Sequence, residues 1–514
     1  KNLIKSACYL QYFEYQKTYS YWKKRNIIHD TPWPIIGTHG YKIFGLKSNA
    51  EIGIILYRKY PKENFIGYYR GSTPELYVKD PQFYKNILTL DFDHFYIRAV
   101  ERNPEKERMM LNLFNCSGDY WRLLRQRLTP AFTNQKLIKM FPLIVRCAEK
   151  LQVAASEVIA GGGIVDAYDM MARYSMECIC SSGFGLDTDI MSERNSQFMT
   201  LGEKIFSRQE WQTRILAIGE AIPSIWKFVN TFYVDRRVKT ALINLVNYMR
   251  AKRKFKPSGR NDFIDLLMEL EALGTMKGES FERKNADGTP VEIELEMDSE
   301  VLAAQVYIFF AAGYSTSAIA ASTTLHYLAL YPDVQHRIQK HIDEILAKHD
   351  NKITYDSICE MSLLDMALKE SMRLFPPTTA FSRICTKQYT FPGTNITIDP
   401  GVRVVIPTQA VYSDEKYFDN PTEYRPERFL AEEVNTRPKY TYLPFCEGQR
   451  KCIGARLGSF QSMAGVAAIL QKFNVVIAPT SKKELKINRN IHHVQVVDGG
   501  LPVKLIAKSD RANM

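Results

Sequence analysis

The chain has 514 residues, of which 45% are hydrophobic and 24% charged, the usage of a globular protein with a large core. Lysine and arginine number 68 against 56 aspartate and glutamate, and this +12 balance suits an acidic partner or an anionic membrane surface. The basic runs lack interleaved aromatic side chains, so nucleic acid is not an expected partner. Nine cysteines, an odd and scattered set, argue against a disulfide framework and indicate reduced thiols.

The N-terminal segment carries charges within its first twenty residues, so it holds no apolar run of the roughly 18 residues that a bilayer-spanning helix needs. A basic group, Lys23-Lys24-Arg25, and a proline-rich stretch, Pro32 to Gly37, follow it. Downstream, the runs 65–69 and 75–78 flank the turn residues 71–74 and predict paired strands, and Pro81 then begins a helix. The polar segment 91–118 exceeds an ordinary connection, which favours a functional loop.

Helical patterning dominates from Trp121 onward, and Trp121 and Arg125 fall on one helix face. The region 211–228 is unusually apolar beside cations, so it is either core or a surface that dips into a membrane. Residues 251–297 are highly charged and predict a flexible surface linker with one helix, 262–273. The adjacent His492 and His493 are expected on opposite faces of a strand, not as a metal pair.

The longest predicted helix covers 298–330 and would be about 50 Å long, enough to cross the molecule. Acidic residues at 298 and 300 suit its first turn, and Pro332 ends it. Its middle, 311–321, is rich in Ala, Gly, Ser and Thr. Small side chains permit either tight packing against another helix or close approach to a flat ligand. Further helices are expected over 332–348 and 363–374, and strands over 391–407.

A ten-residue stretch, Phe445 to Gly454, combines an aromatic residue, two glycines, a cation and Cys452. An apolar run at helical spacing follows it, so Cys452 lies where a loop meets a helix N-terminus. Free backbone N–H groups and the helix dipole stabilise a thiolate there. The alternative for Cys452 alone is a buried structural cysteine.

The pattern Phe-x-x-Gly-x-Arg-x-Cys-x-Gly in this stretch resembles the haem-ligand loop of the cytochrome P450 superfamily. The resemblance implies that the Cys452 thiolate is the axial iron ligand. It also implies that Phe445 shields the sulfur, Arg450 pairs with a haem propionate, Gly448 turns the backbone beneath the macrocycle and Gly454 lets the helix pass close. Cys446 and Gln449 replace a frequent glycine and proline, which implies a less rigid loop.

The sequence Ala312-Gly313-Tyr314-Ser315-Thr316-Ser317 resembles the oxygen-binding motif of the same family. Phe309, Ala312, Gly313 and Thr316 are expected on one face, where the Thr316 hydroxyl would bond dioxygen and relay protons. Ser315 stands where the family usually has a carboxylate. Since a hydroxyl does not supply protons at neutral pH, either Ser315 and water deliver them or coupling is poorer.

Three further sets of residues are implied by the resemblance. Glu370, Arg373 and Arg428 would form a buried structural network around the cysteine loop. Trp121, Arg125 and Arg383 would join Arg450 on the haem propionates. The substrate pocket would include Phe309, Thr379, Ala380, Phe381 and, at the tip of a C-terminal hairpin, Val497.

The resemblance runs from Pro32 to the final hairpin and implies a mainly α fold with small β-sheets (α+β), with haem between the long helix and the Cys452 loop. Residues 1–37 would be a membrane-proximal segment and hinge, and 38–514 a single catalytic domain. We expect an anchor helix ahead of residue 1, with a soluble form as the alternative. The location would be the cytoplasmic face of the endoplasmic reticulum.

The implied activity is insertion of one oxygen atom from O2 into lipophilic small molecules, xenobiotic or endogenous, by a haem-thiolate monooxygenase. The cofactor would be haem b, with electrons from NADPH through cytochrome P450 reductase and cytochrome b5 as a second donor. The stretch Arg127 to Thr133 is most similar to arthropod detoxification-type members. A haem-thiolate isomerase or dehydratase and a non-catalytic haem-binding sensor are the alternatives.

Overall fold

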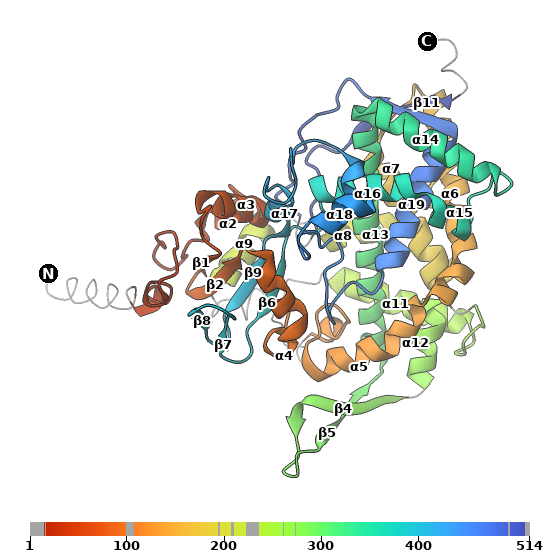
Figure 1. Cartoon of the computed structure of the whole chain (residues 1–514). Helices are drawn as coiled ribbons and strands as arrows, with labels where there is room; N and C mark the ends of the chain where they lie inside the picture. The colour runs from red at the N-terminus through yellow and green to blue at the C-terminus, as the bar shows by residue number, and fades with distance from the viewer. Residues whose placement is uncertain are drawn as a thin grey trace.

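The computed structural model describes residues 15–508 except 16, 99–106, 194–195, 207–209, 223–235, 261, 273 and 492–493. The predictions for His492, His493 and the part of the apolar region beyond 222 lie outside the described residues. Within them the chain is mainly helical with small sheets, as predicted (Figure 1).

The α-helices of the described part follow in chain order. They are α2 (Gly40–Ile43), α3 (Asn49–Lys59), α4 (Phe92–Phe95), α5 (Gly118–Leu128), α6 (Asn134–Ala160), α7 (Ala167–Cys178), α8 (Gln197–Phe206), α9 (Glu210–Ala221), α11 (Arg236–Lys252), α12 (Phe263–Ala272), α13 (Ser299–Leu330), α14 (Pro332–Ala347), α15 (Tyr355–Glu360), α16 (Ser362–Leu374), α17 (Thr408–Tyr412), α18 (Ala431–Thr436) and α19 (Ala455–Lys472). Short 3-10 or π-helical turns join them: η1 (Lys23–Arg25), η2 (Pro81–Phe83), η3 (Asn86–Leu90), η4 (Arg108–Met110), η5 (Thr129–Phe132), η6 (Ile179–Gly183) and η8 (Pro426–Phe429).

The strands form four small sheets. A four-stranded sheet has the order β1 (Phe65–Arg70), β2 (Thr73–Val78), β9 (Arg403–Ile406), β6 (Phe381–Ile384), and a three-stranded sheet the order β10 (Phe473–Ile477), β11 (Pro502–Ala507), β3 (Ile164–Asp166). Two hairpins, β4 (Thr275–Lys284) with β5 (Pro290–Glu296) and β7 (Tyr389–Thr390) with β8 (Thr397–Ile398), complete the set. The predicted pair around residues 71–74 is confirmed as the antiparallel β1–β2 hairpin.

The long helix α13 is the centre of the fold, as the sequence predicts. Asp298 caps it by accepting a hydrogen bond of 2.9 Å from the Val301 N–H, and Tyr331 ends it ahead of Pro332. Within the described part, α13 alone has the length and hydropathy of a membrane span, but two thirds of the relevant window is buried inside the protein. Its apolar character therefore belongs to a core helix.

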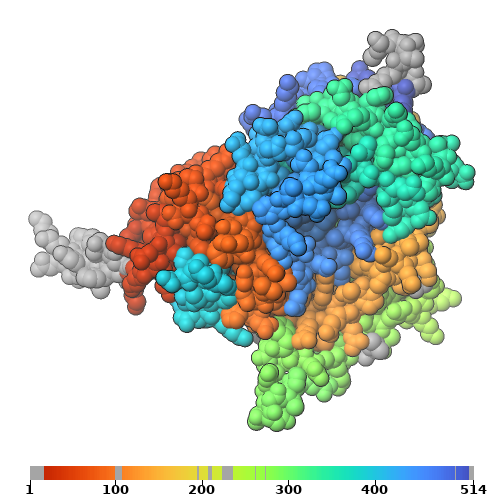
Figure 2. All heavy atoms as spheres, in the orientation of Figure 1, coloured from red at the N-terminus to blue at the C-terminus, as the bar shows by residue number. Residues whose placement is uncertain are grey.

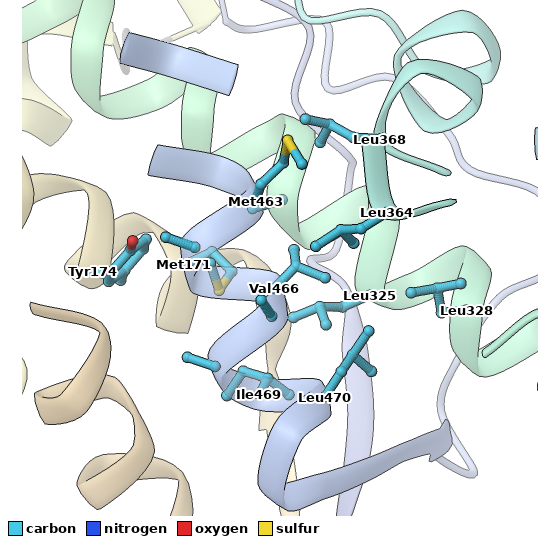
Figure 3. Packing of buried hydrophobic residues seen from close by; sticks show 14 of the residues in the cluster. Met171, Tyr174, Leu325, Leu328, Leu364, Leu368, Met463, Val466, Ile469 and Leu470 are labelled. Atoms are coloured by element: carbon cyan, nitrogen blue, oxygen red, sulfur yellow. The ribbon is translucent and has the colours of Figure 1, made fainter. Parts of the chain in front are cut away.

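The main core packs around α19, and Figure 3 shows that its side chains interlock with those of α7, α13 and α16. The contributing residues are Met463, Val466, Ile469 and Leu470 from α19, Leu325 and Leu328 from α13, Leu364 and Leu368 from α16, and Met171 and Tyr174 from α7. Cys178 is buried in this core, and Cys180 is buried in the neighbouring cluster around α5 and the first half of α13.

The segment 274–297 was expected to be flexible linker, and this prediction is wrong. It forms the β4–β5 hairpin, which lies against α5 at the lower edge of the molecule (Figures 1 and 2). The Asp119 carboxylate accepts hydrogen bonds from Ser280 Oγ at 2.7 Å and Phe281 N at 2.9 Å, and Glu282 accepts one from Asp119 N at 3.0 Å. The Asp287-Gly288 dipeptide is a local signal for a hairpin. The high charge of the surrounding residues led to the prediction of a linker instead.

A buried ion network joins α16 to the chain that leads to the Cys452 loop. Glu370 accepts two hydrogen bonds of 2.8 Å from Arg373 and one of 3.2 Å from Arg428 Nε, and all three side chains are at most 1% exposed. Arg373 also donates to the Tyr412 carbonyl at 2.9 Å, and the Tyr412 hydroxyl accepts from Leu443 N at 2.8 Å. The network therefore fixes the backbone just ahead of the loop.

Replacing Glu370 by Ala should leave two buried guanidinium groups without their carboxylate. We expect the free energy of unfolding to fall by about 3–5 kcal/mol. The control is Asp365→Ala on the same helix, because Asp365 pairs with Lys369 at the surface and both side chains are more than a third exposed. That change should cost under about 1 kcal/mol. Equal losses in denaturant unfolding would show that the network does not hold the fold.

Candidate active site

A cavity of about 710 Å³ is lined by α13, by the loop that carries Cys452 and by residues of the four-stranded sheet, α3 and α9. Cys452 lines it together with Phe445, Ala312 and Thr316, so the structure brings the two predicted motifs into the lining of one space. Cys452 is exposed and lines this cavity, and Cys446, six residues earlier, also lines it but is a buried residue. The predicted juxtaposition of the cysteine loop and the long helix is therefore present.

The loop folds back on itself ahead of α19. The Cys452 N–H donates to the Phe445 carbonyl at 2.9 Å, and Gly454 is the N-cap of α19, which places the cysteine at the predicted junction of loop and helix. Burial raises the pKa of the Cys452 thiol, while the Gly454 N–H and the cations Arg98 and Arg125 lower it. The expected stabilisation of the thiolate is thus outweighed by burial. A bound metal cation would reverse that balance.

Gly448 turns the loop where no other residue fits. Its φ is +78°, and a Cβ at this position would lie 1.8 Å from the Leu88 carbonyl oxygen of η3. Cys446, at the position of a frequent family glycine, has φ +60° and so sits in the left-handed region with a side chain. Gly454 meets nothing closer than the Phe132 ring, at 4.0 Å, so the protein itself does not require glycine there.

A group of guanidinium side chains lines the cavity beside Cys452. It consists of Arg98, Arg125, Arg383 and Arg450. Arg450 is 1% exposed, its Nε donates to the Tyr96 carbonyl at 3.1 Å, and its guanidinium lies 4.3 Å from the Trp121 ring centre. Arg383 donates to the Ser382 carbonyl at 2.9 Å and to Cys446 Sγ at 3.5 Å. The predicted set Trp121, Arg125, Arg383 and Arg450 is thereby brought together.

The positive charges in this group are not balanced. Burial and the neighbouring Arg383 lower the pKa of Arg98 to about 10, and burial together with Arg98 and Arg383 lowers the pKa of Arg450. Arg450 Nη1 and Nη2 and Arg383 Nε are buried without a hydrogen-bond partner among the described residues. Buried cations of this kind require an anion to satisfy them. The two propionates of haem fit this requirement.

Arg98 was not anticipated from the sequence. Its Nη2 donates to the Arg450 carbonyl at 2.8 Å, and it lies in the irregular segment 91–118 that was predicted only as a functional loop. A single arginine in a loop carries no spacing signal, so its position became visible only with the fold.

The opposite wall is the middle of α13. Phe309, Ala312 and Thr316 line the cavity as predicted, and Phe309 packs against the Phe132 and Phe263 rings with centroid separations of 5.2 and 3.9 Å. The Thr316 hydroxyl donates to the Ala312 carbonyl at 2.6 Å, which leaves oxygen lone pairs available as acceptors. The small Ala312 side chain leaves room above the cysteine.

Ser315 and Gly313 are not among the residues that line the cavity. Ser315 is fully buried, and its Oγ has no hydrogen-bond partner among the described residues. A Cβ at Gly313 would lie 2.3 Å from Ile179 Cδ1 of η6, so this glycine serves tight packing of the helix. The structure therefore separates the motif into a cavity half, Ala312 and Thr316, and a packing half.

The predicted substrate residues Thr379, Ala380 and Phe381 line the cavity, but Val497 does not. Val497 is 7% exposed and packs in the main core, and the preceding segment, including Ile487, Asn488 and Gln495, reaches the cavity instead. The expected entry of the hairpin tip at 496–501 is thus wrong by several residues, because the Ile487–Val497 bridge turns the chain earlier.

Replacing Gly448 by Ala tests the close approach of the cysteine loop to η3. The control is Gly393→Ala, since Gly393 has a similar φ of +74° but nothing within 4 Å of its Cβ position. Both variants should lose about 1–2 kcal/mol from left-handed strain. Gly448→Ala should lose a further 1–3 kcal/mol, roughly, from the clash. Equal melting temperatures for the two variants would contradict this account.

Comparisons with known proteins agree with the site. A family model described as Cytochrome P450 matches residues 30–503. The chain is 33% identical to cytochrome P450 6B6 of Helicoverpa armigera over 476 residues, which covers 93% of this chain and 92% of that protein. It is 32% identical to cytochrome P450 6a2 of Drosophila melanogaster over 493 residues, 94% of each chain. Cytochrome P450 6k1 of Blattella germanica is 29% identical over 502 residues, 96% of this chain and 94% of that one.

These comparisons confirm the resemblance to arthropod members. The site agrees with them, because the Cys452 thiol lies in a cavity lined by unbalanced cations. Such a site suits a haem enzyme that receives electrons from a redox partner and acts on lipophilic substrates. The chain belongs to the cytochrome P450 family and is a monooxygenase of the kind found in insects.

Proposed function

We propose that this monooxygenase holds haem b with Cys452 Sγ as the axial ligand and oxidises lipophilic small molecules in the space beneath α13. The observation that carries the proposal is the cavity itself, which has the Cys452 sulfur on one wall and Ala312 and Thr316 on the other. In this proposal Trp121, Arg98, Arg125, Arg383 and Arg450 hold the two propionates. Bound haem supplies the oxidative chemistry.

The protein positions the substrate, keeps water away from it and controls proton delivery. In this proposal Phe445 shields the sulfur, and Phe309, Ala380 and Phe381, which line the cavity, give the substrate an apolar surround. Thr316 Oγ1 holds a hydrogen-bonding position at the helix face, with its own proton directed to Ala312 O at 2.6 Å. A proton can pass along this hydroxyl from water.

We propose NADPH-cytochrome P450 reductase as the electron donor, with cytochrome b5 as a second. Exposed cations, including Arg127 of α5 and Lys451 and Arg456 beside the cysteine loop, support an acidic partner on this side. Complementary charge would speed the encounter and would be screened by salt.

A membrane surface at the cytoplasmic face of the endoplasmic reticulum is the proposed location. Large apolar side chains are exposed on the hinge, on α2 and on α9: Trp33 is 60%, Phe44 52% and Trp211 57% exposed. The ring centres of Trp33 and Phe44 lie 6.4 Å apart, and α2 packs against Ala217 and Ala221 of α9. Exposed apolar area of this kind suits the boundary of a bilayer.

The two alternatives are not favoured. A sensor needs no hydroxyl at Thr316 above the ligand cysteine. The absence of a carboxylate at position 315 does not favour an isomerase, because Ser315 does not line the cavity.

Substitution of Cys452 by Ala tests the ligand assignment. We expect the reduced protein to lose the red-shifted thiolate Soret band with CO, together with reductase-dependent product from a lipophilic probe. Cys446→Ala is the matched control, because Cys446 lies in the same loop and lines the same cavity but is a buried residue. It should keep both signals. A thiolate band that survives in Cys452→Ala would refute the ligand, and a normal band without product in the unmodified protein would refute the monooxygenase.

The neighbouring residues Ser315 and Thr316 should respond differently to loss of their hydroxyls. Thr316→Val should raise the peroxide formed per NADPH consumed, because this hydroxyl faces the cavity. Ser315→Ala should leave that ratio unchanged, since Ser315 does not line the cavity. Peroxide assays on both variants decide the matter. Equal leakage from the two would restore Ser315 as a proton carrier.

A further inference from the structure

The segment just before α5 lines part of the cavity, although it has no regular secondary structure beyond η4. Leu113, Phe114 and Asn115 of this segment are lining residues. Because no helix or sheet ladder satisfies its backbone groups, other partners must do so, and they determine where its side chains stand. We call residues 109–116 the side-wall turn.

One buried side chain shapes the side-wall turn from within. Asn112 is fully buried, and its Nδ2 donates to the Met109 carbonyl at 2.8 Å. Its Oδ1 accepts from Phe114 N at 3.1 Å and from Asn115 N at 3.0 Å. All of these partners lie within three residues of Asn112, so they define the bend of the turn but not its place in the molecule.

A glutamine of α13 fixes the place of the turn. Gln305 is fully buried, and its Oε1 accepts a hydrogen bond from Leu113 N at 3.1 Å. Its Nε2 donates to the Leu111 carbonyl at 2.6 Å and to the Val301 carbonyl of its own helix at 3.1 Å. One side-chain amide therefore satisfies both an N–H and a C=O of the turn, which a neighbouring strand would otherwise have to provide.

A second polar attachment of this segment to α13 lies at the surface. Arg108, just ahead of the turn, pairs with Asp298 at the N-cap of α13, and the two side chains are 37% and 34% exposed. Exposed ion pairs contribute little and permit movement. The buried amide of Gln305 is therefore the stronger constraint on the distance between the turn and the helix.

Arg98 ties the turn to the cysteine loop. Its Nη1 donates to the Phe114 carbonyl at 3.4 Å, and its guanidinium lies 4.5 Å from the Phe114 ring centre. Its Nη2 donates to the Arg450 carbonyl at 2.8 Å. Gln305 and Arg98 thus connect the side-wall turn to the two elements that carry the reactive motifs, α13 and the loop with Cys452.

Gln305 itself does not line the cavity. Phe309 and Ala312, which do, follow it by four and seven residues and so share its side of the helix. The turn is therefore attached about one helical turn away from residues that face the substrate. Any effect of Gln305 on a substrate must pass through the side-wall turn.

We propose that Gln305 is a positioning residue for the substrate. By holding Leu113 and Phe114 at a fixed distance from α13, it determines which carbon atoms of a rigid lipophilic molecule point toward Thr316 and Cys452. Small displacements of a positioning wall have large effects on which atom reacts. The effect on products rests on the proposed function, whereas attachment of the turn and ligand affinity do not.

Gln305→Met tests the proposal, because it nearly preserves side-chain volume and removes both hydrogen bonds to the turn. The probe is phenanthrene, a rigid polycyclic hydrocarbon that can be hydroxylated at several distinct carbons. With haem-loaded protein and reductase, the ratio of the major phenol to the others should fall about threefold or more. Exchange of the Leu113 amide hydrogen should accelerate about tenfold, the value of one buried hydrogen bond. Phenanthrene affinity, read from quenching of its own fluorescence without turnover, should weaken about threefold.

Gln335→Met is the matched control. Gln335 is 2% exposed, and its Nε2 donates to the Leu328 carbonyl at 2.9 Å and the Val475 carbonyl at 2.7 Å. Its Oε1 accepts from Val475 N at 2.9 Å. The pairing of amide and backbone is of the same kind, but neither Gln335 nor these partners line the cavity. This variant should lose a similar amount of thermal stability and keep both the product ratio and the affinity.

Two further variants keep the proposal testable if Gln305→Met does not fold. The carboxyl of Gln305→Glu accepts from Leu113 N and, when protonated, donates to the Leu111 carbonyl. Since burial favours the neutral carboxyl, this variant should keep the product ratio of the unmodified protein at about pH 6 and lose it by about pH 9. Phe114→Ala should lower the ratio by itself, and adding Gln305→Met to it should change the ratio little, because the two residues act through one turn.

An unchanged product ratio in Gln305→Met would overturn the proposal, as would an equal fall of the ratio in Gln335→Met. Unchanged exchange at Leu113 would show that the amide does not hold the turn and would overturn it too. If the unmodified protein oxidises no lipophilic probe, the monooxygenase function fails, and the phenanthrene affinities of the two variants alone decide the role of Gln305.

Discussion

The constraint on which this structure depends is an internal cavity that must stay open inside a close-packed core. Protein interiors tolerate few voids, so a space of about 710 Å³ lined by α13, the Cys452 loop, the four-stranded sheet, α3 and α9 has to be braced from outside. The buried Glu370 network braces the chain before the loop, and Gly448 lets the loop rest on η3. Neither the Glu370 network nor Gly448 lines the cavity, yet each fixes the position of the chain that forms one of its walls.

Local signals predicted most of this framework. Asp298 and Pro332 bounded α13 correctly because caps and prolines act through the nearest backbone groups. The charged segment 274–297 was misjudged because its strands are stabilised by α5, through Asp119 and Glu282, and such distant partners leave no periodic trace. The position of Val497 failed for the same reason, since a bridge to Ile487 decides where the chain turns.

The sequence motifs predicted which residues lie near the site, because a motif fixes the spacing of residues along the chain. They did not predict which way each side chain points. Cys452 and Thr316 were placed on facing walls, as the two motifs implied. Ser315 adjoins Thr316 in sequence, but one residue is a rotation of about 100° on an α-helix, which turns its side chain into the packed side. The departure from the family pattern at Ser315 therefore affects the packing inside the protein more directly than it affects the cavity.

The cavity lining beside Cys452 carries an unbalanced positive charge. Arg383 and Arg450 keep buried donors that have no partner among the described residues. Burying a cation is costly, so a fold that retains such groups is complementary to negative charge. The cations beside Cys452 suit the propionates of a cofactor, so binding of that cofactor would balance the charge that the folded chain leaves unpaired.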